Sequence, residues 1–171
     1  MWLYTALMPV WGLLVLLLLG LAACGGGGLV PEAGEPEPHP LDHLEQAVIV
    51  IDEEPYLVWL AETPSAQARG LQGITEEQLA PLPDGTERGM LFVFPLDTRP
   101  EFWMRDTAVP LDLAFVENDG LVAETHAMEP LDETLVQPAV PVRYALELRG
   151  GVFGARGIGK GSAVDLGAVA D

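Results

Sequence analysis

The stretch Phe102–Gly120, which reads FWMRDTAVPLDLAFVENDG, most constrains what this chain can fold into. In its second half, apolar residues recur at a period of two, as in a strand with one apolar face: Leu111, Leu113 and Phe115. Residues 102–107 alternate in the same way, and Pro110 interrupts the ladder because it has no backbone N–H. Asp119-Gly120 favours a tight turn before the next strand. We therefore predict three antiparallel strands side by side, over 102–107, 111–116 and from Leu121 onward.

The rest of the chain reads as short strands separated by turns. Its 19 glycines and 15 prolines favour strands and turns over long helices. Strand-length apolar runs cover residues 47–51, 56–60, 89–94, 121–128, 142–148 and 162–166. Thr63-Pro64 and Thr75 predict the starts of two short helices. We expect 142–148 to be half-buried, with Arg143 and Glu147 on its more polar face. The predicted fold class is β-rich α+β: a compact, mostly antiparallel sheet or partly open barrel with one or two short helices.

The N-terminal region has the pattern of an export signal. Residues 1–23 carry no charged side chain and end in small residues, which predicts a signal peptide. The sequence Leu21-Ala22-Ala23-Cys24-Gly25 resembles the lipobox of bacterial lipoproteins, although no Lys or Arg precedes the apolar run. The resemblance implies that Cys24, the only cysteine, is lipidated and anchors the chain to a membrane. A plain transmembrane helix is the alternative, because about 20 apolar residues can span a bilayer.

The predicted domain organisation follows from this anchor. Residues 24–41 comprise the lipidated cysteine and a tether rich in Gly, Pro and Glu, which contains too little apolar surface to form a core. Residues 42–171 form a single globular domain. We expect the protein in the cell envelope, exported and membrane-anchored on the periplasmic or extracytoplasmic face. Gly25 resembles the residue that follows the cysteine in lipoproteins of the outer membrane, if the organism has one.

The charge balance excludes one class of partner. The chain has 26 acidic and 8 basic residues, which gives a formal net charge of −18. A surface this acidic repels phosphate backbones, so we expect no nucleic-acid partner.

Several segments resemble the domain of unknown function 192 family. They are Arg69-Gly70-Leu71, GMLFVFP (89–95), FWMRDTAVPLDLAFV (102–116), Gly120, YALEL (144–148) and Gly151. The resemblance spans about Ala47 to Leu166, and the FWM…PLD block is its specific element. It implies a small, β-rich domain of a largely prokaryotic, often exported family, and it carries no established activity. Arg105-Asp106 stands where Lys-Asn is usual, and Gln72 stands where Met is usual.

A polar cleft is the strongest candidate site. Its predicted members are Arg69, Trp103, Arg105, Asp106, Asp112 and Glu147. The cleft could bind a sugar or a peptide, with Trp103 as an amphipathic platform. Alternatively, the charged residues only brace the fold through arginine–carboxylate pairs, which is the more common use of buried charges. On that view Asp112→Asn lowers the melting temperature and changes no binding.

A hydrolase is the alternative function. Asp106 and Asp112 are weak catalytic candidates, since glycoside hydrolysis uses two carboxylates about 5–9 Å apart. No spacing of His, Cys or Asp predicts a metal site, and no glycine-rich motif predicts a phosphate or cofactor site. We therefore expect no cofactor. The preferred interpretation is a lipid-anchored envelope protein that acts as a non-enzymatic binding or accessory domain, whose partner is an unknown envelope ligand or protein.

Overall fold

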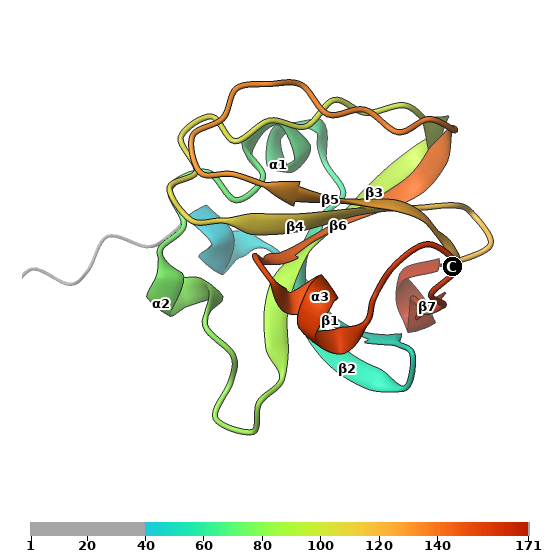
Figure 1. Cartoon of the computed structure of the whole chain (residues 1–171), viewed down its shortest axis with the longest axis horizontal. Helices are drawn as coiled ribbons and strands as arrows, with labels where there is room; N and C mark the ends of the chain where they lie inside the picture. The colour runs from blue at the N-terminus through green and yellow to red at the C-terminus, as the bar shows by residue number, and fades with distance from the viewer. Residues whose placement is uncertain (1–39, 171) are drawn as a thin grey trace, which may run out of the picture. The chain divides into compact units, whose positions relative to one another are not determined.

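The computed structural model describes residues 40–170. The predicted signal peptide (1–23), the lipidation site Cys24 and the tether up to residue 39 lie outside the described residues. The elements (Figure 1) are a 3-10 helix η1 (Pro40–His43), strands β1 (Gln46–Ile51) and β2 (Glu54–Ala61), helices α1 (Pro64–Arg69) and α2 (Glu76–Leu79), strands β3 (Glu87–Thr98), β4 (Leu111–Val116), β5 (Val122–Met128) and β6 (Val142–Arg149), helix α3 (Val152–Arg156), strand β7 (Val164–Asp165) and a 3-10 helix η2 (Gly167–Ala170).

The seven strands form one mixed sheet in the order β5-β4-β6-β3-β2-β1-β7. Every neighbouring pair is antiparallel except β2 and β3, which run parallel. A parallel pair needs a crossover connection, and here residues 62–86, with α1 and α2, provide it. Thr63 caps α1 and a capping box formed by Thr75 and Gln78 begins α2, as the sequence predicts. The β-rich α+β fold class is confirmed.

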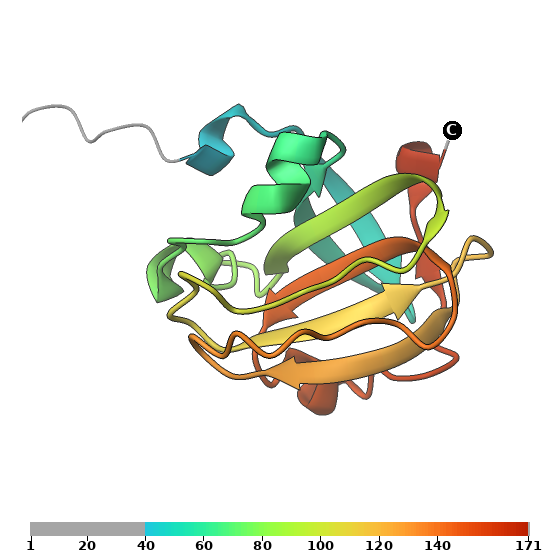
Figure 2. The same ribbon diagram turned by 90° about the horizontal axis from the view of Figure 1, so that it is seen from above.

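The sheet curls strongly, as Figure 2 shows. The segment that leads into β7 approaches the far edge of the sheet, where the amide of Val164 donates to the carbonyl of Gly120 over 2.8 Å. A bridge between Leu121 and Ala163 makes the same connection. Residues from β5 and from β1 therefore share one apolar cluster inside the curl, and the sheet forms a partly open barrel.

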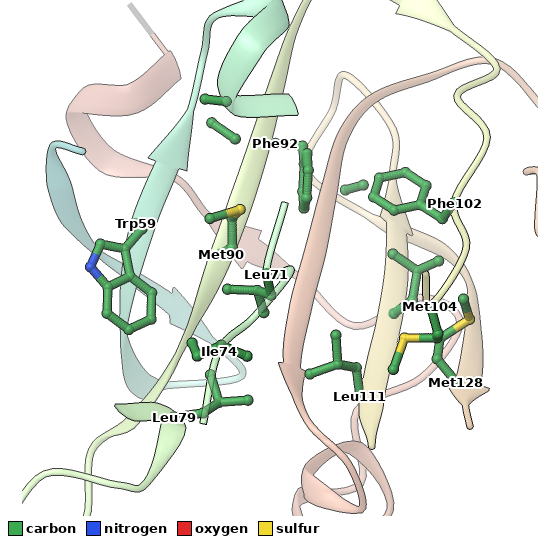
Figure 3. Close-up of a cluster of buried hydrophobic side chains, with 14 of the residues drawn as sticks. Trp59, Leu71, Ile74, Leu79, Met90, Phe92, Phe102, Met104, Leu111 and Met128 are labelled. Carbon is green, nitrogen blue, oxygen red and sulfur yellow. The ribbon is translucent and has the colours of Figure 1, made fainter. Parts of the chain in front are cut away.

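Each face of the sheet carries its own apolar cluster. The first cluster contains Leu111, Leu113 and Phe115 of β4 together with Leu79 of α2. Figure 3 shows part of it, including Phe92 of β3. The second cluster lies inside the curl and includes residues of α3. Helices α1 and α2 thus cover one face, whereas α3 covers the other, and both faces of the central strands are buried.

The predicted strand over residues 102–107 is wrong. Phe102 makes a single bridge to Val136, and Asp106 has a positive φ of 55°, so the segment is irregular. Phe102 and Met104 are nevertheless buried in the first cluster. The alternation in the sequence reflects this burial, not strand pairing, because β6 occupies the position beside β4.

One further expectation needs correction. Strand β6 is not half-buried, because it lies between β4 and β3 and Glu147 is only 4% exposed. At the start of the described residues, Leu41 of η1 is buried in the first cluster. The remaining predicted strands are present, and a further short helix, α3, follows Gly151.

Candidate functional site

A pocket of about 390 Å³ opens on the face of the sheet that α1 covers. It is bounded by the C-terminal end of α1, by β3 and β6, and by the loops that follow β3 and β5. Its apolar walls are Leu71, Phe92, Phe94, Phe102, Trp103 and Leu135. The rings of Phe92 and Phe102 meet edge to face with centroids 4.9 Å apart, and Figure 3 shows the two side chains together. The volume suits a small organic ligand.

Glu147 is the buried acid of this pocket. It lines the pocket from β6 and is 4% exposed. Its Oε2 atom has no hydrogen-bond partner among the residues that the structure describes. Burial raises the pKa of the Glu147 carboxyl to about 8, because removal from water disfavours the charged form. The carboxyl group is therefore mostly protonated at neutral pH.

The position of Glu147 follows from the register of the central strands. Its neighbours across the ladder are Met90 of β3 and Leu113 of β4, both in the first cluster. Directly paired residues point to the same face of a sheet. The carboxyl group thus rises from an apolar surface, beneath Gly70 at the end of α1: a Cβ on Gly70 would lie 3.9 Å from Glu147 Oε2.

Most other polar side chains of the pocket are already engaged. Gln67 Nε2 donates to the carbonyls of Ala61 and Val93 over 3.1 and 2.8 Å. Thr107 Oγ1 donates to a backbone carbonyl, and Glu101 Oε1 accepts from Gln137 over 2.7 Å. Within residues 40–170, Arg69 makes no ion pair, so it is an exposed cation at the rim.

Trp103 stands at the mouth of the pocket and is 36% exposed. The guanidinium of Arg105 stacks on its ring at 3.8 Å from the centroid. The same guanidinium pairs with Glu133 at 2.9 Å. Arg105 therefore holds the indole in place from outside the pocket, in keeping with the attraction of a cation to an aromatic face.

The structure brings together Arg69, Trp103 and Glu147 of the predicted cleft, but not the two aspartates. Asp106 is exposed in a turn, and its backbone carbonyl accepts from Gly73. Asp112 is buried beside α3 on the opposite face of β4, where its Oδ2 accepts from the amide of Phe153 over 2.8 Å. Asp112 thus caps the first turn of α3, so the cleft of six residues is corrected to a pocket with Glu147 as its acid.

Residues 40–170 contain neither a clustered set of metal ligands nor a membrane-spanning helix. No group of three or more His, Cys, Asp or Glu side chains in this range is placed to hold a metal ion. No helix in this range has the length and apolar character needed to cross a bilayer.

Apart from Trp103, the pocket walls are the part of the site that was not predicted from the sequence. Phe92 and Phe94 recur at a period of two in GMLFVFP, but a run that is apolar on both faces gives no sign of which face borders a cavity. Leu135 lies in a loop between prolines, where no pattern marks it.

Comparisons with known proteins agree with this fold. The family model DUF192, described as "Uncharacterized ACR", matches residues 47–166. A crystal structure of a protein of unknown function from Novosphingobium aromaticivorans DSM 12444 is 33% identical, with a TM-score of 0.63, over 82% of this chain and 99% of that one. A Sinorhizobium meliloti 1021 protein described as a "putative transcription regulator" is 28% identical, with a TM-score of 0.65, over 71% of this chain and 94% of that one. No curated protein matches the sequence.

Proposed function

The chain belongs to the DUF192 family, and on that premise we propose that it is a lipid-anchored envelope protein whose folded domain binds a small ligand in the pocket at Glu147, without catalysis. One observation carries the binding role: a carboxyl group that is 4% exposed lines a pocket of about 390 Å³, and its Oε2 is unpartnered among the described residues. An unpaired buried polar group reduces stability. A ligand that pairs with it would recover that loss.

The geometry favours binding over hydrolysis at the two aspartates. Asp112 Oδ2 is engaged by α3 on the opposite face from the pocket, and Asp106 lies exposed in a turn. A role in transcription, as named for the Sinorhizobium protein, is also disfavoured here. With 26 acidic and 8 basic residues, the chain has little positive charge to offer a phosphate backbone.

Export and anchoring are supported by the sequence of residues 1–41. An uncharged apolar run leads into Leu21-Ala22-Ala23-Cys24-Gly25, and a tether rich in Gly and Pro follows. Intact mass of the protein in the membrane fraction tests this part. We expect a diacylglyceryl addition on a chain that begins at Cys24, lost in Cys24→Ser. An unmodified and uncleaved N-terminus would contradict the lipid anchor.

Ligand binding is tested with full-length protein in lipid nanodiscs by saturation-transfer NMR. The probes are phenethylamine, phenethyl alcohol and phenylacetate, which share a phenyl ring and differ in their polar group. We expect at least one probe to bind, and Trp103→Ala to weaken it because a wall of the pocket is removed. The control is Leu96→Ala, which truncates a side chain that is 74% exposed and lies outside the pocket. No binding of any probe at millimolar concentration, or equal effects of the two substitutions, would contradict the proposal.

A further inference from the structure

We propose that the ligand carries an ammonium group on an apolar body, and that this ammonium group binds the Glu147 carboxylate. The inference rests on the proposed ligand-binding function and adds the chemical class of the ligand. Glu147 is the ionisable group buried in the pocket, and the other buried polar side chain there, Thr107, donates its hydroxyl to a backbone carbonyl. The cation of the pocket lining, Arg69, is exposed at the rim. A ligand that reaches the inner part of the pocket therefore meets an acid.

The walls favour the same class of ligand. Four aromatic side chains line the pocket: Phe92, Phe94, Phe102 and Trp103. Aromatic faces attract organic cations and also cover the apolar part of such a molecule. Arg105 already stacks on Trp103 at 3.8 Å, so one of these rings carries a cation in the structure. The formal net charge of −18 attracts cationic ligands and repels anionic ones over longer distances.

A metal cation does not fit this chemistry. Calcium takes six to eight oxygen ligands, and magnesium requires octahedral coordination. The pocket offers the carboxyl group of Glu147 and that of Glu101, which accepts from Gln137. No metal-holding group of acidic, histidine or cysteine side chains occurs in the described range. One buried carboxylate among aromatic rings instead suits one ammonium group.

Binding of an ammonium group should depend on pH. The ammonium pairs with the ionised carboxylate, so binding must release the proton that burial holds on Glu147. Arg69 and Glu101 line the same pocket. His126 and Glu124 of β5 lie on the same face of the sheet, where His126 is separated from Glu147 by Leu113. Because His126 is a titratable side chain on this face, the experiment includes a control at His126.

Calorimetry on the full-length protein in nanodiscs tests the inference with phenethylamine and phenethyl alcohol. With the Glu147 pKa at about 8, we expect phenethylamine to bind roughly twentyfold more tightly at about pH 8.5 than at about pH 6.5. Glu147→Gln should weaken phenethylamine at least about tenfold at the higher pH and remove the pH dependence. Two control variants should keep the affinity for phenethylamine and its pH dependence. They are Glu87→Gln, which alters a buried glutamate outside the pocket, and His126→Gln.

The outcomes separate the inference from the function on which it rests. If phenethyl alcohol or phenylacetate binds at least as tightly as phenethylamine, or if phenethylamine binds more weakly as the pH rises, the ammonium assignment is overturned while the binding function stands. If none of the probes binds, the binding function itself is contradicted.

Discussion

At the scale of single residues, the central feature is a buried glutamate, Glu147, whose Oε2 has no hydrogen-bond partner among the described residues. Burial raises the pKa of Glu147 from 4.5 to about 8. Between these values the unfolded chain loses its proton while the folded domain keeps it. The free energy of unfolding therefore falls as the pH rises through this window, and the effect of Glu147 is absent below about pH 4.5.

This linkage predicts the effect of Glu147→Gln on stability. The variant keeps the shape of the side chain and cannot ionise. The difference in unfolding free energy between the variant and the wild type should therefore grow in favour of the variant from about pH 4.5 to about pH 8. This difference should approach at most about 5 kcal/mol. Chemical denaturation at a series of pH values measures this difference. Glu87→Gln is the matched control: Glu87 is buried but pairs with Arg149 at 2.9 Å, so its removal should destabilise the domain at neutral pH. Parallel pH profiles for wild type and Glu147→Gln would contradict the account.

Asp112 shows the opposite use of a buried acid. Its Oδ2 accepts the amide of Phe153 over 2.8 Å, so Asp112→Ala should lower the free energy of unfolding by about 1–3 kcal/mol. The same substitution should leave phenethylamine binding unchanged, because Asp112 lies on the face of β4 opposite the pocket. Thermal denaturation and calorimetry check the two parts. Loss of phenethylamine binding in an Asp112→Ala protein that remains folded would show that Asp112 contributes to the binding site, which would contradict this assignment.

At the scale of elements, the pairing of β3 with β6 positions the pocket. The two strands approach so closely at Gly89 that a Cβ there would overlap the backbone oxygen of Glu147 and the side chain of Leu148. Gly89→Ala should therefore lower the unfolding free energy by about 3 kcal/mol or more. Gly154→Ala is the matched control, since Gly154 is exposed in α3 with open space around it and alanine favours a helix by up to about 1 kcal/mol. A Gly89→Ala protein as stable as the wild type would contradict the packing described.

The elements themselves were largely predictable from local patterns. The two capped helices and the strands around residues 47–60 follow from turn residues and alternation, which act over a few neighbours. The parallel pairing of β2 with β3 could not be predicted, because it depends on how a long crossover packs. The prediction of a strand over 102–107 was wrong for a related reason. The alternation reflects burial of Phe102 and Met104, whereas a strand also needs an unoccupied edge to pair with, and β5 and β6 occupy both sides of β4.

The site was predictable only in part. The structure places Arg69, Trp103 and Glu147 of the predicted cleft around one pocket, and their role in binding a ligand stays a prediction. Asp112 was grouped with Glu147 because each alternates with apolar residues in its own strand. The register sets Leu113, not Asp112, opposite Glu147, which sends the two acids to opposite faces. Register between strands depends on tertiary packing, and a single sequence does not reveal it.

At the scale of the whole molecule, we propose a membrane anchor near the N-terminus of the chain and a ligand-binding domain after it. The pocket draws on segments spread from residue 67 to residue 147, so it exists only when the sheet is complete. The net charge of −18 gives the chain a field that favours cations. The buried carboxyl group of the pocket and the net negative charge of the chain thus both favour a cationic ligand.

The measurement that tests this account most directly is a carbon NMR titration of the glutamate carboxyl groups in the full-length protein, with and without phenethylamine. We predict one glutamate signal, absent in Glu147→Gln, that titrates with a pKa of about 8. Phenethylamine should lower that pKa, because the ammonium group stabilises the ionised carboxylate, and phenethyl alcohol should not. If every glutamate carboxyl titrates in the ordinary range and phenethylamine shifts none of their pKa values, both the raised pKa of Glu147 and the proposed ammonium ligand are contradicted.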